Sequence, residues 1–345
     1  METLNIEPFT DKRYDRFVNA HPQASFFHSS QWAQVLSDSY GFKPFCISLV
    51  SNNAIVGTIP LFETRSLTQL RQGVSLPFSD MCEPLLDYQD DFLKIFEACI
   101  EIGKKNHWRY IELRGGTRLL SAEPVFETIL THEIELWPEE DTLFKSFHSS
   151  TVRNIHHAQK EGITVTHETS YKALQFFYQL NCLTRREHCL PPQPWSFFLN
   201  LWETVLKRGH GFITLASRNN TPIAADLFLI HNRNAIYKYG ASDRIYQRLR
   251  ASSLVMWEGI KKCKEMGCQS LNFGRTEIHH NGLLQFKRGF GCNETTLNYY
   301  RYDLAKDLFV QGHGPSKSKL PQRLVSKLPI PLLKFVGSVL YKYSS

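Results

Sequence analysis

The sequence predicts an α/β protein built from two similar domains, and three observations support this prediction. A chain of 345 residues is longer than one compact hydrophobic core usually covers. Residues 47–62 and 213–228 share one pattern: an alternating apolar strand, a turn with paired asparagines and a second strand. After each hairpin come an extended stretch, an amphipathic helix and a short strand that ends beside glycine and arginine. We therefore expect two α/β domains rather than one large sheet.

Hydrophobic spacing predicts the elements in order. In the first copy, residues 91–105 form a helix with one apolar face, and residues 110–114 form the strand that follows. In the second copy, the helix spans about residues 252–266 and the strand residues 271–273. Between the copies we expect helices at residues 143–147, 151–161, 171–188 and 195–208, the first capped by Asp141 and the second by Ser149 or Ser150. The predicted domains are residues 1–137 and 138–304, followed by a tail of residues 305–345.

Residues 271–291, LNFGRTEIHHNGLLQFKRGFG, carry the most chemistry in the chain. The strand ends at Gly274, which leaves Arg275 at its carboxyl end. We expect the next helix to turn its leucines and Phe286 inward and Lys287 away from the core. Small-molecule sites in open α/β sheets lie at strand ends, so Lys287 is the first candidate functional residue. The alternative is an ordinary solvated lysine on a surface helix.

Composition limits the protein class. The charged start METLNIEPFTDKRYDRF lacks the apolar run of a signal peptide, and no stretch has the roughly 18 apolar residues of a membrane span. We therefore expect a cytoplasmic protein whose eight cysteines are reduced thiols. The cysteine pairs lack C-x-x-C spacing and the adjacent histidines cannot point the same way, so we expect no metal site.

The net charge of +7 is concentrated in the tail, where six basic residues and no acidic residue follow Asp307: Lys317, Lys319, Arg323, Lys327, Lys334 and Lys342. Apolar residues recur at helical spacing after Pro331, on a face made of Leu332, Phe335, Val336, Val339, Leu340 and Tyr343. Lys334, Ser338 and Lys342 take the opposite face. This pattern predicts an amphipathic helix that attaches the protein to an anionic membrane surface, the inner face of the cell membrane. The alternative is that the apolar face packs against the body.

Four segments, in this order and spacing, resemble the Fem-type aminoacyltransferases and their relatives in the GNAT superfamily: SLPFSDMCEPLL, YIELRGG, TVRNIHHAQKEGITV and FGRTEIHHNGLLQFKRGFG. The resemblance covers nearly the whole chain and is to the branch found among cell-envelope and exopolysaccharide genes. It implies two tandem GNAT-like domains, each a twisted mixed sheet flanked by helices. It also implies transfer of an acyl or aminoacyl group to an amine, on a lipid-linked or nucleotide-linked precursor of peptidoglycan or exopolysaccharide.

The donor is left open by one departure from that pattern. Acetyl-coenzyme A enzymes of the superfamily hold the donor pyrophosphate on a glycine-rich turn at a helix N-terminus. The equivalent stretch here, residues 246–252, contains no glycine, although Arg248 and Arg250 offer side chains that clamp phosphates. Acyl-coenzyme A and aminoacyl-tRNA are therefore both candidate donors. No tightly bound cofactor is expected.

The resemblance assigns Lys287 to the lysine that stabilises charge on the transferred carbonyl, and Arg275 either shares this role or forms an ion pair with Glu277. Two sets of acids are candidate bases. Asp80 and Glu83 lie in a proline-flanked loop, where capping a turn is the alternative role. Asp226 lies in an apolar strand, either paired with Lys238 or carrying a raised pKa.

Arg153, His157 and Lys160 recur at helical spacing and form a cationic stripe. Such a stripe either binds phosphates of the donor or acceptor or is a solvated face.

Three functions are consistent with the sequence. The first is an acyl- or aminoacyltransferase that acts on an envelope precursor, and the second is a soluble coenzyme A-dependent N-acyltransferase on a small metabolite. The third is a non-catalytic module that binds RNA or membrane; an RNA-binding module would be expected to interleave aromatic and basic residues on one face.

Overall fold

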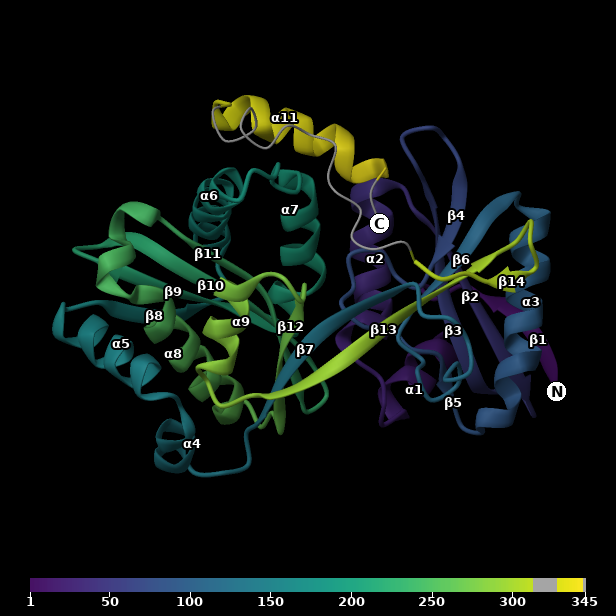
Figure 1. Cartoon of the computed structure of the whole chain (residues 1–345), viewed down its shortest axis with the longest axis horizontal. Helices are drawn as coiled ribbons and strands as arrows, with labels where there is room; N and C mark the ends of the chain where they lie inside the picture. The colour runs from purple at the N-terminus through teal and green to yellow at the C-terminus, as the bar shows by residue number, and fades with distance from the viewer. Residues whose placement is uncertain (313–327, 344–345) are drawn as a thin grey trace. The chain divides into compact units, whose positions relative to one another are not determined.

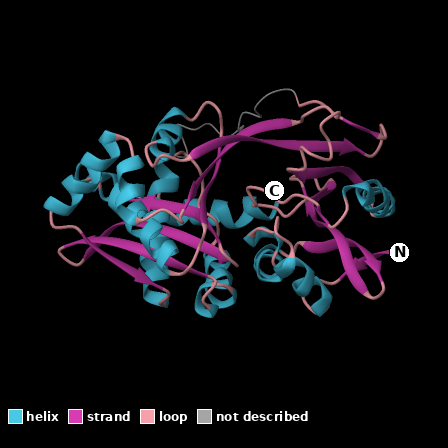
Figure 2. Cartoon of the chain, turned by 90° about the horizontal axis from the view of Figure 1, so that it is seen from below, coloured by secondary structure: helices cyan, strands magenta, loops and turns pink. Residues whose placement is uncertain are grey.

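The structure, a computed structural model, describes residues 1–312 and 328–343 and divides them into two compact units. Unit 1 contains residues 1–129, 296–312 and 339–343, and unit 2 contains residues 130–295 and 328–338. Each unit is a mixed sheet with helices on both faces (Figures 1 and 2). The predicted α/β fold class is therefore confirmed.

The sheet of unit 1 has the order β1-β2-β3-β4-β6-β13, with β5 beside β3 and β14 beside β13. Its helices are α1, α2 and α3, and short 3₁₀ turns precede α2 and α3. The bounds are β1 (Glu2–Ile6), α1 (Lys12–Ala20), α2 (Ser30–Tyr40), β2 (Lys43–Ser51), β3 (Ala54–Arg65), β4 (Arg71–Val74), β5 (Leu85–Leu86), α3 (Phe92–Lys105), β6 (Trp108–Arg114), β13 (Asn293–Asp303) and β14 (Leu308–Phe309).

The sheet of unit 2 has the order β7-β12-β11-β10-β9-β8. Helices α5 and α8 pack against each other beside β8, β9 and β10, and α6 packs on β9, β10 and β11 together with α7. The bounds are β7 (Glu127–Glu135), α4 (Glu140–Ser146), α5 (Ser149–Lys160), β8 (Thr164–Glu168), α6 (Tyr171–Glu187), α7 (Trp195–Thr204), β9 (Gly211–Arg218), β10 (Thr221–His231), β11 (Asn234–Ser242), η4 (Arg244–Leu249), α8 (Ala251–Glu265), β12 (Ser270–Thr276), α9 (Asn281–Arg288), α11 (Ile330–Leu340) and η5 (Tyr341–Tyr343), of which η5 and the end of α11 belong to unit 1.

The two units have the same topology. A three-stranded antiparallel run, a helix and a parallel strand follow one another as β2-β3-β4-α3-β6 and as β9-β10-β11-α8-β12. Both hairpin turns use an asparagine pair in the left-handed conformation, Asn52 and Asn53 in one unit and Asn219 and Asn220 in the other. This conformation matches the twist of the flanking strands, which is why the sequence pattern recurs. The predicted internal repeat is confirmed.

The last strand of each sheet does not follow the order of the chain. Residues 130–135 of β7 pair with β12 in unit 2, and residues 299–303 of β13 pair with β6 in unit 1. The division expected from the sequence placed residues 130–137 in the first domain and residues 296–304 in the second. The difference arises because hydrophobic alternation predicts a strand but does not name its partner.

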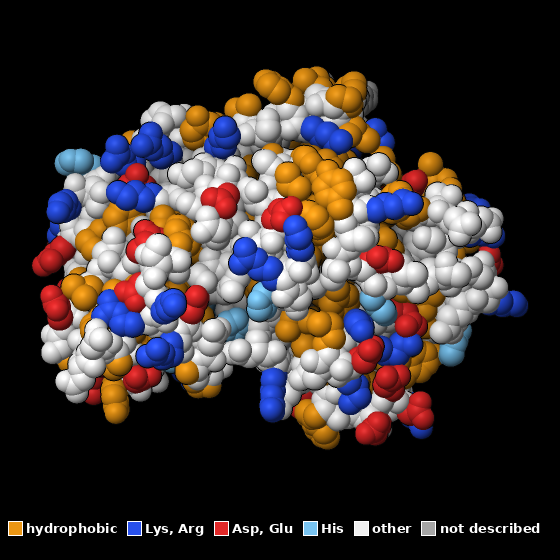
Figure 3. Space-filling view, turned by 180° about the vertical axis from the view of Figure 1, so that it is seen from behind, with side chains coloured by type: hydrophobic (Ala, Val, Ile, Leu, Met, Phe, Trp, Pro, Cys, Tyr) orange, Lys and Arg blue, Asp and Glu red, His pale blue; other side chains and the backbone are white. Residues whose placement is uncertain are grey.

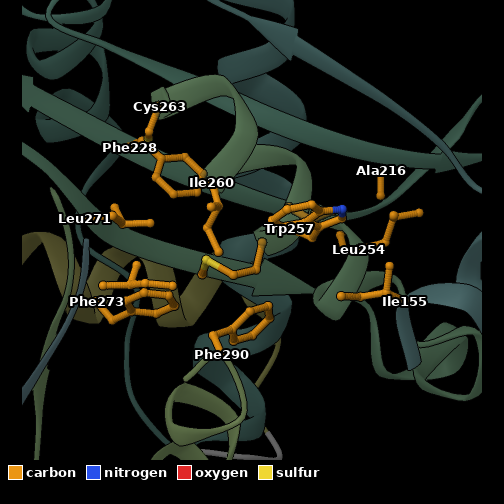
Figure 4. Packing of buried hydrophobic residues seen from close by; sticks show 14 of the residues in the cluster. Ile155, Ala216, Phe228, Leu254, Trp257, Ile260, Cys263, Leu271, Phe273 and Phe290 are labelled. Atoms are coloured by element: carbon orange, nitrogen blue, oxygen red, sulfur yellow. The ribbon is translucent and has the colours of Figure 1, made fainter. Parts of the chain in front are cut away.

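The core of unit 2 lies between the sheet and the pair α5 and α8 (Figure 4). Phe228 of β10 and Trp257 of α8 belong to this core. Phe273 of β12 and Phe290, which follows α9, also belong to it. Gly259 permits the close approach of α8, because a Cβ atom there would lie 2.3 Å from the Phe228 ring. This core fixes the starts of α5 and α8, which carry the basic residues discussed below.

Two predicted helix caps are wrong. Helix α4 begins after Glu139 and α5 after His148, neither with a side-chain cap, so Asp141 and the two serines lie inside the helices. The start of α5 is held instead by α9, because the backbone N–H of His148 donates to the carbonyl of Gly289 over 2.9 Å. The cationic helix and the helix of Lys287 are therefore directly connected.

The tail helix α11 packs through a face that the sequence did not predict. Leu333 is fully buried, and Gly337 lies against Pro192, whose carbonyl oxygen would be 2.0 Å from an added Cβ atom. The ammonium of Lys334 lies 4.8 Å from the centre of the Tyr178 ring, so Lys334 is on the packed side rather than facing solvent. Lys317, Lys319, Arg323 and Lys327 lie outside the described residues.

The apolar face that was predicted is largely exposed. Leu332, Phe335 and Val339 are 45%, 66% and 43% exposed, and apolar side chains lie along the outer side of α11 (Figure 3). None of the helices in residues 1–312 and 328–343 combines the length and apolarity that a membrane crossing requires.

Candidate active site

Strand β12 of unit 2 contains a bulge at the predicted strand end. The register between β12 and β7 shifts between Asn272 and Arg275, and Gly274 adopts a positive φ of 71° that favours glycine. The N–H of Gly274 donates to the side-chain oxygen of Asn272 over 2.8 Å. Gly274 thus satisfies its N–H locally, and its carbonyl accepts a hydrogen bond from a side chain.

Lys287 supplies that donor, and its predicted orientation was wrong. Leu284 and Lys287, three residues apart on α9, both face inward, and Lys287 is only 2% exposed. Its Nζ lies 2.8 Å from the carbonyl oxygen of Gly274 and 3.1 Å from that of Arg275. A buried ammonium requires such acceptors, and the bulge provides them. Lys287 is thus not the solvated surface lysine that was its alternative reading.

Arg275 takes part in this arrangement through its backbone carbonyl, while its side chain is exposed at the end of β12. Glu277 is also exposed. The part of β12 that the sequence singled out therefore contributes two backbone carbonyls that bind the Lys287 ammonium and an exposed arginine side chain.

The five predicted anion-binding residues line one cavity. A pocket of about 630 Å³ lies between α5 and η4, and its lining includes Arg153, His157, Lys160, Arg248 and Arg250. The imidazole Nε2 of His157 lies 3.1 Å from the carbonyl oxygen of Arg248, which ties η4 to α5. Asn154 and His156 complete the lining. The helical spacing in α5 and the arginines before α8 thus describe a single cationic pocket.

Arg250 has an unusual backbone in this pocket. It precedes the first turn of α8 with φ 57° and ψ 24°, a left-handed conformation that glycine adopts at low cost. The first turn of α8 has no side-chain cap. Its N–H groups, together with the helix dipole, favour an anion at this end. The sequence thus places an arginine side chain where the backbone geometry would suit glycine.

A second cavity, of about 470 Å³, shares Asn154 and Arg250 with the cationic pocket. It extends from the start of α8 to Phe286, the residue before Lys287, and one wall is the last turn of α6. Thr184 of α6 and Ser242 of β11 fix this wall through a 2.9 Å hydrogen bond from the backbone N–H of Ser242 to the threonine hydroxyl. The two cavities and α9 therefore form a continuous candidate site within unit 2.

Sequence reasoning missed the titratable residues of that wall. Burial raises the pKa of Glu187, although the positive charge of Arg244 opposes this shift. Burial is also the main cause that lowers the pKa of His188, and the nearby charge of His280 lowers it further. Both residues line the 470 Å³ cavity. They end an ordinary amphipathic helix and belong to no recognisable motif, so no local signal distinguishes them from solvated residues.

Asp226 is paired, but not with the residue expected. The structure places the carboxyl against the phenol of Tyr237 on β11, whereas the Lys238 ammonium lies 5.5 Å from the Tyr239 ring centre. Burial raises the pKa of Asp226 well above its usual range, and its Oδ2 is buried without a hydrogen-bond partner in the described chain. Asp226 is therefore a buried core acid whose surroundings favour the neutral carboxyl.

Asp80 and Glu83 lie in unit 1, in a loop that is rigid for a reason visible in its contacts. Leu76 and Phe78 adopt positive φ values of 46° and 59°. Arg114 fixes the loop by donating from its guanidinium to the carbonyl of Ser79 over 3.0 Å. The backbone carbonyl of Asp80 accepts from Tyr299 over 2.6 Å.

The Glu83 side chain lies against Gly115, where an added Cβ atom would be 2.4 Å from its Cγ. The fixed loop that the prolines predicted is present in unit 1. Lys287, Arg275 and Asp226 belong to unit 2. No group of His, Cys, Asp or Glu in residues 1–312 and 328–343 has the arrangement of a metal site.

Comparisons with known proteins relate this geometry to a family. Residues 145–288 match the family model of the acetyltransferase (GNAT) domain. The fold is similar to the crystal structure of FemX, with a TM-score of 0.71 and 15% identity over 86% of this chain and 97% of that chain. No curated protein sequence matches this chain.

Two further structures are similar. The C-terminal domain of a putative lysylphosphatidylglycerol synthetase from Agrobacterium fabrum has a TM-score of 0.55 and 12% identity, over 84% of this chain and 90% of that domain. A tandem GNAT protein from the clavulanic acid biosynthesis pathway has a TM-score of 0.57 and 8% identity, over 92% of this chain and 99% of that one. At these identities the similarity concerns the fold, and it confirms the expected GNAT-like tandem architecture.

Proposed function

This chain carries a GNAT acyltransferase domain in residues 145–288, and on that basis we propose that it forms an amide on an amine of a cell-envelope or polysaccharide precursor. The observation that carries this proposal is the cationic pocket, an open depression lined by Arg153, His157, Lys160, Arg248 and Arg250. Five basic side chains around one cavity suit a donor that carries phosphates. The neighbour named as a putative lysylphosphatidylglycerol synthetase supports an envelope acceptor, whereas the tandem GNAT protein from the clavulanic acid pathway supports the second candidate, a free metabolite.

The transfer step requires of the site a base for the amine and a fixed cation for the carbonyl oxygen. The amine nitrogen attacks the donor carbonyl, the ester or thioester bond breaks, and the amine proton passes to the leaving oxygen or sulfur. A neutral amine requires a base, and Glu187 and Asp80 with Glu83 are the candidates, because Glu187 lines the cavity and the acid pair lies in a rigid loop. Charge on the carbonyl oxygen requires a fixed cation, the role we propose for Lys287 with Arg275 beside it.

Two donors are candidates for the pocket. The uncapped start of α8 supports acyl-coenzyme A, the donor used by GNAT domains, because backbone N–H groups there suit a pyrophosphate. Arg250 supports aminoacyl-tRNA instead. A glycine at this position would let a phosphate approach the backbone closely, whereas the arginine side chain restricts that approach and adds a positive charge for a nucleic-acid phosphate. A soluble coenzyme A-dependent N-acyltransferase is thus the second candidate function.

Donor identity can be tested with full-length protein and an envelope extract as the acceptor. Transfer from aminoacyl-tRNA should stop after ribonuclease treatment, whereas transfer from acetyl-coenzyme A should release one free thiol for each amide formed. Activity with neither donor would contradict the proposed function and leave a binding module. An Arg208→Gln variant serves as a charge-matched control, because Arg208 is exposed and does not line the cationic pocket.

Replacing Arg153 or Arg248 with glutamine should mainly raise the apparent Michaelis constant for the donor. A charged hydrogen bond to a phosphate contributes roughly 1.5–3 kcal/mol, which corresponds to a roughly ten- to hundredfold rise. The rate at saturating donor should change little, because binding of a remote phosphate is mostly uniform between ground and transition states. Steady-state kinetics of both variants beside Arg208→Gln checks this. Unchanged Michaelis constants for donor and acceptor would remove that arginine from the anion site.

We further propose that the protein is cytoplasmic and attaches reversibly to an anionic membrane surface, where a lipid-linked acceptor would be found. The support is the outer face of α11, on which Leu332, Phe335 and Val339 are exposed while Leu333 holds the helix to unit 2. Burying each apolar side chain contributes roughly 1.5–3 kcal/mol, and each basic residue near anionic lipid adds about 1 kcal/mol.

Replacing Phe335 and Val339 with glutamate should abolish flotation with vesicles that contain phosphatidylglycerol. Both side chains are exposed, so the change should leave the thermal midpoint nearly unaltered. Leu93→Glu is the matched control, because Leu93 is an equally exposed leucine on α3. Salt should weaken wild-type flotation, since exposed charges are screened beyond about 10 Å at 0.1 M. Equal flotation of the double variant and the wild type would contradict membrane attachment through α11.

A further inference from the structure

A buried histidine faces the site of Lys287 from the neighbouring strand. His132 lies on β7 and is 0% exposed. In the register of β7 and β12, Thr131 pairs with Arg275 and Glu133 pairs with Asn272. His132 therefore stands opposite Phe273 and Gly274, the bulged residues, and the Gly274 carbonyl accepts a hydrogen bond from the Lys287 ammonium.

The imidazole is connected to α9 through a carboxylate. His132 Nε2 lies 2.8 Å from a carboxylate oxygen of Glu294, and Arg288 binds both oxygens of the same carboxylate at 2.7 and 2.8 Å. Arg288 directly follows Lys287 on α9. Glu294 thus fixes the last turn of α9 from outside while the two backbone carbonyls hold Lys287 from inside.

The other ring nitrogen is buried without a partner. Nδ1 of His132 has no hydrogen-bond partner in the described part of the chain. When Nε2–H donates to Glu294, Nδ1 is the unprotonated nitrogen, and a proton added there would place a second positive charge in the same interior. Burial, followed by the charge of Lys287, lowers the pKa of His132 below its usual 6.5, while Glu294 opposes and Arg288 reinforces the shift.

We propose that His132 is a positioning residue for Lys287, which keeps the ammonium on the carbonyls of Gly274 and Arg275 only while the imidazole is neutral. The consequence for activity rests on the proposed transferase function. A charged imidazole would repel the buried ammonium, and the repulsion is relieved when Lys287 leaves the carbonyls or loses its proton. In either case the site loses its fixed cation. The charged groups that face the imidazole are Lys287 and Arg288 of α9 and Glu294 of β13.

The sign of the pH effect follows from linkage. The pKa of His132 is lower in the folded state than in the unfolded state, so the unfolded chain takes up the proton first. The stability that the neutral imidazole provides is present above the usual value of 6.5 and is lost as the pH falls through the folded pKa. The proposed loss of Lys287 from its carbonyls should follow the folded pKa and not the unfolded one.

The coupling can be measured without any substrate. In the full-length protein labelled with ¹⁵N at histidine and lysine, the His132 titration midpoint should rise when Lys287 is replaced by methionine, because one positive charge is removed. The Lys287 ammonium signal should broaden below the His132 midpoint in the wild type and stay sharp in His132→Gln. The control is His167 on β8, whose pKa burial also lowers and whose Nδ1 bonds to Thr214. A His132 midpoint that does not respond to Lys287→Met would overturn the proposal.

Activity provides the second measurement. His132→Gln keeps an N–H that reaches Glu294 but does not titrate, so it should lose the acid limb of the pH–rate profile with less than about a tenfold loss of rate at mildly alkaline pH. His132→Ala should lose much more at every pH. An acid limb that persists in His132→Gln would overturn the proposal, as would equal losses in both variants. If the wild type transfers no acyl group at all, the proposed function fails, and the magnetic resonance titration still decides whether His132 positions Lys287.

Discussion

Replacing Lys287 with methionine should lower the rate of acyl transfer at saturating substrates by about a hundredfold or more, as loss of one preorganised donor typically does. The ammonium is 2% exposed and lies 2.8 and 3.1 Å from two backbone carbonyls that the β12 bulge provides. Methionine has a similar length and fills the same space, so the change removes the charge with little loss of packing. The rate constants of the two proteins, measured under saturation, test this expectation.

Lys264→Met is the matched control. Lys264 on α8 also donates to two backbone carbonyls, those of Leu136 and Trp137, at 3.0 and 3.5 Å. It lies in the last turn of α8, at the far end of that helix from Arg250 and the cationic pocket. Its replacement should therefore leave the rate near that of the wild type. Equal rates for the wild type and Lys287→Met would place Lys287 outside the mechanism and reduce it to a structural residue.

Replacing Glu112 with alanine should destabilise unit 1 by about 3–5 kcal/mol, the usual result of removing one partner from a buried ion pair. Glu112 of β6 lies 3.3 Å from Arg114 and 2.6 Å from Arg301, and Arg114 is only 3% exposed. Without the carboxylate, two guanidinium groups remain near one another in the interior. Arg301 also stacks between the rings of Tyr110 and Phe126, at 4.0 and 3.6 Å from their centres, which holds its guanidinium beside the Glu112 position although its side chain is 24% exposed.

Urea unfolding of Glu112→Ala measures this loss, with Asp307→Asn as the control, because the Lys104–Asp307 pair is exposed and such pairs add little to stability. Burial alone raises the pKa of Glu112, but Arg114 and Arg301 outweigh it and hold the pKa below the usual value. The pair's stabilisation is thus present at neutral pH and is lost as the pH falls through the folded pKa. A difference that persists at acid pH would contradict this account of the network.

The loop of Asp80 and Glu83 depends on the same network, since Arg114 also binds the carbonyl of Ser79. This explains why the sequence could predict the loop's rigidity only in part. The prolines are visible as local signals, whereas the anchor comes from Arg114 on β6 and Tyr299 on β13, far along the chain. Contacts of that range leave no pattern in a single sequence.

Local patterns predicted most of the fold. The paired asparagines predicted both hairpin turns, and helical spacing predicted α3 and α8 within one or two residues. They did not predict that β7 and β13 join the sheets of unit 2 and unit 1, because strand pairing depends on tertiary partners. Lys287 was assigned outward for a related reason: an inward lysine requires free carbonyls, and these arise from the bulge at Gly274.

The cationic pocket was accessible to sequence reasoning because its residues follow helical spacing in α5 and flank the start of α8. Glu187, His188 and His132 were not, because each acquires its character from burial and from neighbours on other elements. In the tail, the helix was predicted but its packed face was not. Spacing predicted a helix there, but the packed face runs through Leu333 and Gly337, and the contact with Pro192 decides it.

The central claim is that unit 2 transfers an acyl group from a phosphate-bearing donor to an amine, and one label-transfer measurement tests it most directly. Purified protein is incubated with an envelope fraction and a donor whose acyl group carries a radiolabel, supplied as aminoacyl-tRNA in one reaction and acyl-coenzyme A in another. Hydroxylamine cleaves ester and thioester label and leaves amide label in place. We expect hydroxylamine-resistant label from one donor with the wild type and Lys264→Met, and almost none with Lys287→Met. No resistant label from either donor, or equal label with Lys287→Met, would contradict the account.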